Sequence, residues 1–149
     1  MKKSRLRKYA SLIVGYGINV QAGQDVLIQA NIENSDFTLL CVEECYRRGA
    51  RKVVVDWLSQ DLDKININYR SLETLSQVED YEKAKLKWRV DKLPCLIWLD
   101  GDDPDGLNGI DVEKYGVSMQ KRGKIIKKYR DAMDGKFQWC IAAEIGRAS

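Results

Sequence analysis

Two short apolar runs, separated by a segment with helical character, constrain this sequence more than any other feature. The first run is Asp25–Ala30 (DVLIQA). The second lies within residues 51–57 (RKVVVDW), where consecutive valines are typical of a strand buried on both faces. Between them, Asn34, Ser35 or Asp36 can cap a helix start, because each side chain can accept hydrogen bonds from free backbone amides. Strand, helix and strand within about thirty residues predict a βαβ unit with parallel strands.

The same alternation of helical and strand patterns continues along the rest of the chain. We expect a helix over 5–18, mostly helical structure over 58–90, a strand over 94–99, a helix over 111–133 and a strand over 137–143. Ser71 and Asp111 are expected to cap two of these helices. The order predicts a single α/β domain over residues 5–143, with a mostly parallel sheet and helices on both faces in a Rossmann/flavodoxin-like three-layer architecture.

The segment Gly15–Gly23 (GYGINVQAG) invites comparison with a dinucleotide-binding loop. That motif needs glycine where Val20 stands, and it must connect a strand to the start of a helix. Here the glycines follow a helical pattern instead. We therefore interpret the segment as the end of a helix rather than as a phosphate site.

The acidic, glycine-rich loop Asp100–Ile110 (DGDDPDGLNGI) suggests calcium at first sight. A calcium loop needs glycine at its sixth position and glutamate at its twelfth. Taking Gly106 as the sixth position puts Gly101 first and Val112 twelfth, so the sequence does not match a calcium loop. Weak binding of a cation at the surface of the loop is an alternative. We expect the aspartates to be solvated and to cap the following helix. Because the loop follows the carboxyl end of a parallel strand, we also expect it to form the wall of a cleft.

A basic segment, Gln120–Arg130, holds six Lys or Arg residues and no acidic residue. A nucleic-acid-binding protein could use such a stripe to contact phosphates. Yet Ile125, Ile126 and Tyr129 give the segment an apolar side, and the net charge of the chain is only +3. We interpret the segment as a solvated helix face and expect no nucleic-acid partner.

The four cysteines argue for a core role rather than for a metal site. Each lies inside an apolar run, as buried free thiols usually do: Cys41, Cys45, Cys95 and Cys140. The sequence has no CxxC pair and no histidine, so a zinc site is disfavoured. Without histidine, the common hydrolytic triads and most mixed-ligand metal sites cannot be assembled from these residues. We expect reduced thiols in a reducing compartment.

The chain also lacks the sequence signals of membrane proteins and secreted proteins. No apolar run approaches the roughly 20 residues that a membrane span needs. The amino end is basic, but the apolar stretch and cleavage site of a signal peptide do not follow. We therefore expect a cytoplasmic location and no membrane partner.

Four segments, taken in order, resemble the amino-terminal domain of one enzyme family. They are KYASLIVGYGINVQAGQDVLIQA, DFTLLCVEECYRRGARKVVVDW, GDDPDGLNGID and WCIAA, and together they cover essentially Leu6 to Ala143. The family is the M29 family of metal-dependent aminopeptidases, the thermophilic aminopeptidase or aminopeptidase T group. No single motif decides the assignment, but four motifs in the family's order make the resemblance specific.

The resemblance implies an exopeptidase that removes amino-terminal residues from peptides, with two divalent metal ions (cobalt, zinc or magnesium) activating water. It also implies a cytoplasmic homodimer. The family's metal ligands lie in a carboxyl-terminal domain beyond the matched region, and family chains are more than twice as long. No catalytic, cofactor-binding or metal-binding residue is therefore assigned to this chain, and Asp56, Trp57 and Asp102 receive no active-site role.

Our leading hypothesis is that the chain is the non-catalytic amino-terminal portion of such an enzyme, inactive alone. The last residues, 144–149 (EIGRAS), depart from the family's pattern, and we expect them to be a non-native or truncated tail. The alternative is a free-standing α/β binding or protein-interaction module without enzymatic activity. A domain taken from a larger protein should expose an apolar patch where its partner lay, which a free-standing module should not.

Overall fold

The computed structural model describes residues 3–143, which form two compact units. The first unit combines residues 3–58, 94–102 and 137–143, and the second combines residues 59–93 and 103–136. The predicted single domain over 5–143 stays a prediction. The expected tail at 144–149 lies outside the described residues.

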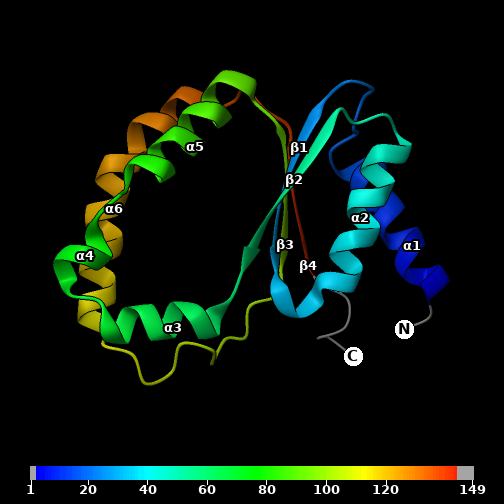
Figure 1. Cartoon of the computed structure of the whole chain (residues 1–149). Coiled ribbons are helices and arrows are strands. Elements are labelled where there is room, and N and C mark those ends of the chain that lie inside the picture. The colour runs from blue at the N-terminus through cyan, green and yellow to red at the C-terminus, as the bar shows by residue number, and fades with distance from the viewer. Residues whose placement is uncertain (1–2, 144–149) are drawn as a thin grey trace. The chain divides into compact units, whose positions relative to one another are not determined.

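A parallel sheet organises the first unit. Its strands are β1 (Asp25–Asn31), β2 (Lys52–Leu58), β3 (Cys95–Asp100) and β4 (Trp139–Ala143), in the order β2-β1-β3-β4 (Figure 1). Every strand pairing is parallel. The predicted α/β class with a parallel sheet is confirmed, and all four predicted strands are present.

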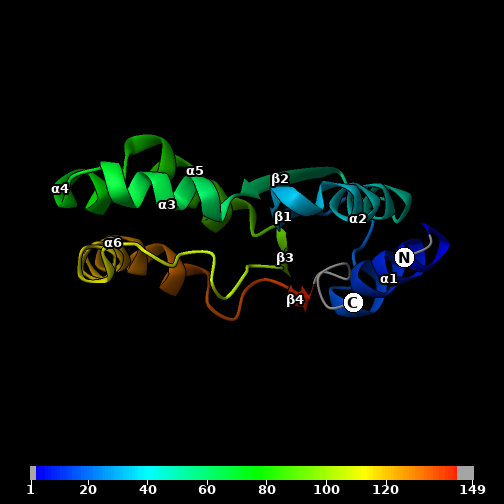
Figure 2. The ribbon, with the colours of Figure 1, turned by 90° about the horizontal axis from the view of Figure 1, so that it is seen from below.

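Two helices cover one face of this sheet. They are α1 (Lys3–Leu12), continued by the π-helical turn η1 (Ile13–Gly17), and α2 (Ser35–Arg47), and they pack against each other (Figure 2). Alternate residues of each strand point toward them, so Ile28 and its register partner Ile97 are fully buried in the core. On the helix side, the Tyr9 and Phe37 rings pack with their centroids 5.4 Å apart. Burial of these apolar side chains is what holds the helices to the sheet.

The valine-rich strand β2 departs from the prediction. It was expected to be buried on both faces, but among the strands of residues 3–143 it lies at the edge and pairs with β1 alone. Val53, Val54 and Val55 are half-buried. The central strand β1 is the more buried one, with only Asp25 and Gln29 partly exposed. A β-branched run reports strand propensity, and it does not distinguish an edge strand from a central one.

Local caps explain how the first unit turns between its elements. Asn34 occupies the N-cap position of α2, but its side chain makes no capping hydrogen bond, unlike the prediction. The Asn31 side chain instead accepts a hydrogen bond of 2.9 Å from the Glu33 amide, at the start of the short 3-10 turn η2 (Ile32–Asn34). At the other end, Gly49 adopts φ 93° beyond the last turn, so it ends α2 as a C-terminal glycine does.

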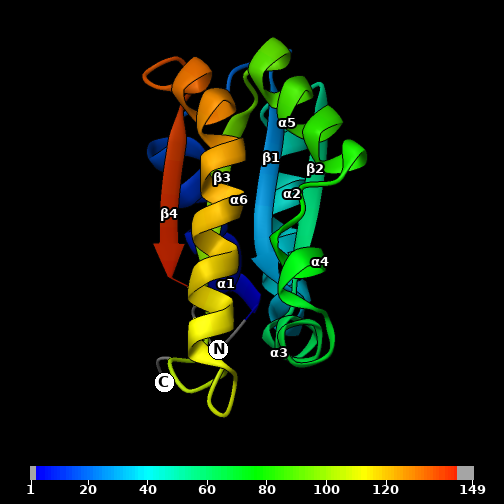
Figure 3. The ribbon, with the colours of Figure 1, turned by 90° about the vertical axis from the view of Figure 1, so that its left-hand side faces the viewer.

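The second unit is helical. Its helices are α3 (Gln60–Tyr69), α4 (Leu72–Ser76), α5 (Asp80–Lys92) and α6 (Val112–Met133), and α6 packs against α4 and α5 (Figure 3). The polar stretch predicted as mostly helical therefore divides into three helices. Each begins at a capping group: the Ser59 and Ser71 side chains cap α3 and α4, and Glu79 with Glu82 forms a capping box at α5. Within residues 3–143, no helix combines the length and apolar character that crossing a membrane requires.

Candidate functional site

The acidic loop after β3 is held in place by one side chain of α3. The Gln60 side chain donates a hydrogen bond to the Asp103 carbonyl (3.1 Å) and accepts one from the Asp103 amide (2.9 Å). Gly106 passes so close that a Cβ there would collide with the Gln60 amide group. These two hydrogen bonds, with the close approach of Gly106 to Gln60, hold the loop against the start of α3 within the second unit.

Two aspartates in or just after this loop accept hydrogen bonds from nearby backbone amides. The Asp103 carboxylate accepts a hydrogen bond of 2.9 Å from the Asp105 amide, and the Asp111 carboxylate accepts one of 3.0 Å from the Lys114 amide at the start of α6. The predicted helix cap at Asp111 is confirmed. The predicted role of the loop as the wall of a cleft stays a prediction.

The described residues do not fit a metal centre of the kind the family resemblance implies. Among residues 3–143, no three His, Cys, Asp or Glu side chains are placed together so that they could hold an ion. A site with two metal ions requires several such ligands converging on each ion. We therefore derive no reaction step through a metal in this chain.

The cysteines lie in the core as free thiols. Cys41, Cys45 and Cys95 are buried, and Cys140 is half-buried. Burial, with the neighbouring thiol of Cys45 and the Glu44 carboxylate, raises the pKa of Cys41 to about 12. Burial, with Cys95 and Glu44, also raises the pKa of Cys45 to about 12. These thiols stay protonated near neutral pH and are unsuited to act as nucleophiles.

A shallow cavity of about 440 Å³ lies in the first unit beside the glycines of η1, lined by Gly15, Tyr16, Asn19 and Arg48. Arg48 donates hydrogen bonds to the Ser11 hydroxyl (3.3 Å) and to the Glu44 carboxylate (3.3 Å). Its charge is therefore already paired. Gly15 and Gly17 lie in a helical turn that no strand precedes within residues 3–143, which agrees with the helix-end interpretation.

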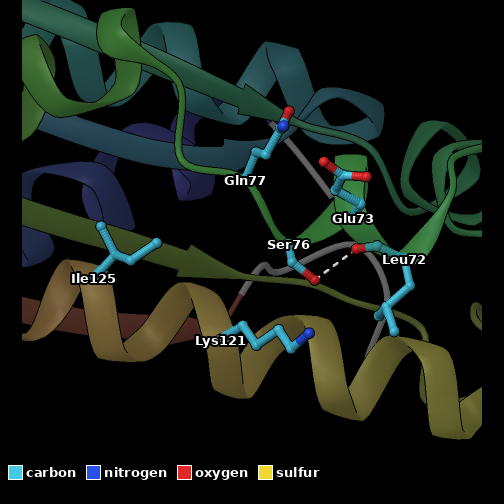
Figure 4. Close-up of a pocket in the computed structure, with 6 residues that line it drawn as sticks. All are labelled: Leu72, Glu73, Ser76, Gln77, Lys121 and Ile125. Carbon is cyan, nitrogen blue, oxygen red and sulfur yellow. Dashed lines mark hydrogen bonds between the residues drawn. The ribbon is translucent and has the colours of Figure 1, made fainter.

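A second groove lies between α4 and α6 and has a volume of about 390 Å³ (Figure 4). Its lining residues are Leu72, Glu73, Ser76, Gln77, Lys121 and Ile125. The Ser76 hydroxyl donates a hydrogen bond of 2.6 Å to the Leu72 carbonyl, so it is engaged within its own helix. The apolar lining of the groove comes from Leu72 and Ile125, and its charged lining is one carboxylate, Glu73, and one ammonium, Lys121. It suits contact with another chain segment better than bond-breaking chemistry. Sequence reasoning missed it, because its two sides come from residues about 50 positions apart.

Most of the basic segment of α6 is solvent-exposed, as predicted, but Arg122 departs from the prediction because its partly buried side chain pairs with Glu82. The Lys127 ammonium pairs with the Asp131 carboxylate at 2.7 Å along the helix surface. The predicted apolar side is smaller than expected: Ile126 and Tyr129 are half-buried, whereas Ile125 is 37% exposed and lines the groove.

The comparison with known families decides the assignment. A family model described as thermophilic metalloprotease (M29) matches residues 2–147. The chain belongs to the M29 family. This confirms the resemblance that the four sequence motifs carried.

Curated M29 relatives are aminopeptidases that are much longer than this chain. Aminopeptidase PepS of Streptococcus thermophilus is 30% identical over 146 residues, which are 97% of this chain and 35% of PepS. Aminopeptidase AmpS of Bacillus subtilis is 29% identical over 97% of this chain and 35% of AmpS. Wild-type AmpT from Thermus thermophilus, a solved structure, has a TM-score of 0.85 at 26% identity, over 96% of this chain and 36% of AmpT. The chain thus spans about a third of the length of the relatives it matches.

Proposed function

We propose that this chain is the non-catalytic amino-terminal portion of a metal-dependent aminopeptidase that removes amino-terminal residues from peptides. One observation carries the proposal: an M29 match over residues 2–147 in a chain that spans only 35% of PepS. The names of the relatives support peptides as substrates of the whole enzyme.

The metal centre of the whole enzyme belongs, in this proposal, to a carboxyl-terminal portion outside this chain. The sequence contains no histidine, and the acidic loop commits Asp103 and Asp111 to a turn and a helix cap. When bound, two divalent ions (cobalt, zinc or magnesium) would supply an activated water and polarise the scissile carbonyl. This chain would contribute packing surfaces that shape the substrate cavity or the contacts between subunits.

Location and assembly complete the proposal. We expect the whole enzyme to be a cytoplasmic homodimer. The apolar groove between α4 and α6 supports a packing role for the second unit.

Metal titration tests the proposed division of labour. The chelator-treated chain is titrated with Co²⁺ and with Zn²⁺ in a calorimeter. We expect no saturable binding at micromolar concentrations, because the described residues offer no converging ligand set. Tight binding of two ions per chain would contradict the proposal.

A further inference from the structure

Helix α3 is apolar on two opposite sides. Ile67 is only 2% exposed. Leu62, Ile65 and Tyr69 follow one another at steps of three and four, so they share one face of the helix. They are 55%, 55% and 86% exposed, respectively. We call these three residues the α3 stripe.

An exposed stripe of this kind is unusual for a helix that already has a buried side. Surface helices normally present polar residues opposite their core-facing stripe. Single exposed apolar residues need no explanation, but three on one helical face form a patch that indicates a contact surface. Asp61 lies one turn before Ile65 on this face, and Arg70 directly follows Tyr69 at the end of the helix.

The α3 stripe is followed directly in the chain by the groove described above. Tyr69 ends α3, and Leu72, at the start of α4, lines the groove. The groove itself carries Lys121 and Glu73 beside its apolar floor. The second unit thus offers two apolar surfaces joined through a two-residue connection.

We propose that the α3 stripe is the surface on which the remaining two thirds of an M29 aminopeptidase chain dock. This inference rests on the proposed function. The relatives provide the occupant: about two thirds of their length has no counterpart here.

A second copy of this chain is a poorer occupant for the stripe. A stable interface between separate proteins uses about 20–30 residues on each side, and the stripe supplies three. Joining two parts of one polypeptide avoids most of the entropy that separate molecules lose on association. A smaller contact can therefore hold two portions of one chain together, and the same two portions, once separated, should still bind each other but only weakly.

The test measures binding between this chain and the part of PepS that lies outside the 146 matched residues. This chain is labelled with a fluorophore and titrated with that PepS portion, and binding is followed by anisotropy. Three variants are compared with the unmodified chain: the double substitution Leu62→Ser with Ile65→Ser, the single substitution Tyr69→Ser, and the control Tyr81→Ser. Tyr81 is 75% exposed on α5, outside the stripe. Because all four positions are exposed, each variant should keep the melting temperature of the unmodified chain, and circular dichroism checks this.

We expect the double variant to bind at least about tenfold more weakly, Tyr69→Ser to be weakened in the same direction, and Tyr81→Ser to stay within about twofold. Equal binding by the double variant overturns the inference and leaves the proposed function standing. A reference titration uses the PepS region that this chain matches. If that region binds and this chain does not, the proposed function fails as well. If neither binds, the two portions form no docking contact, and the inference alone is overturned.

Discussion

Arg122 on α6 pairs with Glu82 in the first turn of α5. Its Nη2 lies 2.6 Å from Glu82 Oε1, and each side chain is only about a quarter exposed. Glu82 Oε2 also accepts a hydrogen bond of 2.8 Å from the Glu79 amide, which closes the capping box of α5. Arg122 donates a further hydrogen bond to the Gln77 carbonyl. One guanidinium therefore joins three helices of the second unit at the junction between α4 and α5.

Replacing Arg122 should destabilise the second unit. Arg122→Met keeps much of the side-chain length and removes the charge, leaving the Glu82 carboxylate partly buried without its partner. We expect a loss of about 1–3 kcal/mol in the free energy of unfolding, measured with urea. Lys127→Met is the matched control on the same helix, because its ion pair with Asp131 is well exposed. The control should cost less than about 0.5 kcal/mol. Equal losses in the two variants would contradict the role assigned to Arg122.

The same pair predicts a pH dependence of stability. Burial is the largest single influence on Glu82 and raises its pKa, but the hydrogen bonds from Arg122 and the Glu79 amide, with the Arg122 charge, leave the pKa below its usual value. A carboxyl whose pKa is lower in the folded state stabilises the fold above its unfolded pKa of about 4.3. That contribution is lost as pH falls through the folded-state pKa.

Urea unfolding between pH 7 and pH 3 measures this contribution. The unmodified chain should lose stability more steeply below about pH 4.3 than Glu82→Gln, which cannot titrate at this position. Glu82→Gln should already be less stable at pH 7. Parallel pH profiles for the two proteins would show that the Glu82 carboxylate is not stabilised as described.

A side chain at Gly106 should displace the Gln60 side chain from the loop. A Cβ at this position would collide with the Gln60 amide group, which holds Asp103 by two hydrogen bonds. Gly106→Ala should cost about 1–2 kcal/mol and loosen the loop, detectable as faster hydrogen exchange at the Asp103 amide. Gly116→Ala, inside α6 and with open space around its Cβ, should instead stabilise the chain by about 0.5–1 kcal/mol. A neutral Gly106→Ala would mean that the contact with Gln60 does not restrain the loop.

The core thiols should be chemically inert in the folded chain. With a pKa of about 12, roughly one Cys41 or Cys45 thiol in 10,000 is ionised at pH 8. A thiol reagent such as DTNB should therefore label these positions only after denaturant is added. Because the thiols ionise more readily in the unfolded chain, stability should also decline as pH rises above their ordinary value of about 8.5 toward 12. Rapid labelling of Cys41 or Cys45 without denaturant would contradict the described packing.

Periodicity and capping residues were enough to predict the strands and most helices of this fold. Asp111 and Ser71 cap helices as expected, because a cap depends only on residues within one turn. The edge position of β2 could not be predicted, because its valine run is equally suited to either position. Within 58–90 the helix start at Ser71 was predicted, but the starts after Ser59 and Glu79 were missed for a different reason. Ser59 and Glu79 cap helices inside a stretch whose helical pattern looks continuous.

The candidate groove and the long-range contacts of the second unit were less predictable than the fold. Arg122 and Glu82 lie 40 residues apart, and nothing in the chain connects them before α5 and α6 pack. The groove between α4 and α6 was missed for the same reason, because its two sides are also distant in the sequence. The α3 stripe, in contrast, is visible in the sequence, because Leu62, Ile65 and Tyr69 follow one another at helical spacing. It could not be recognised as exposed until the buried side of α3, marked by Ile67, was known.

The proposed division of an M29 enzyme into this chain and a separate catalytic portion is tested most directly by an aminopeptidase assay. The purified chain is incubated with a leucyl substrate in the presence of Co²⁺, Zn²⁺ or Mg²⁺, and leucine release is followed against a chelator-treated sample. The expected result is no release above that background under any metal. Sustained release that requires the metal and disappears with the chelator would show that this chain holds a catalytic centre of its own.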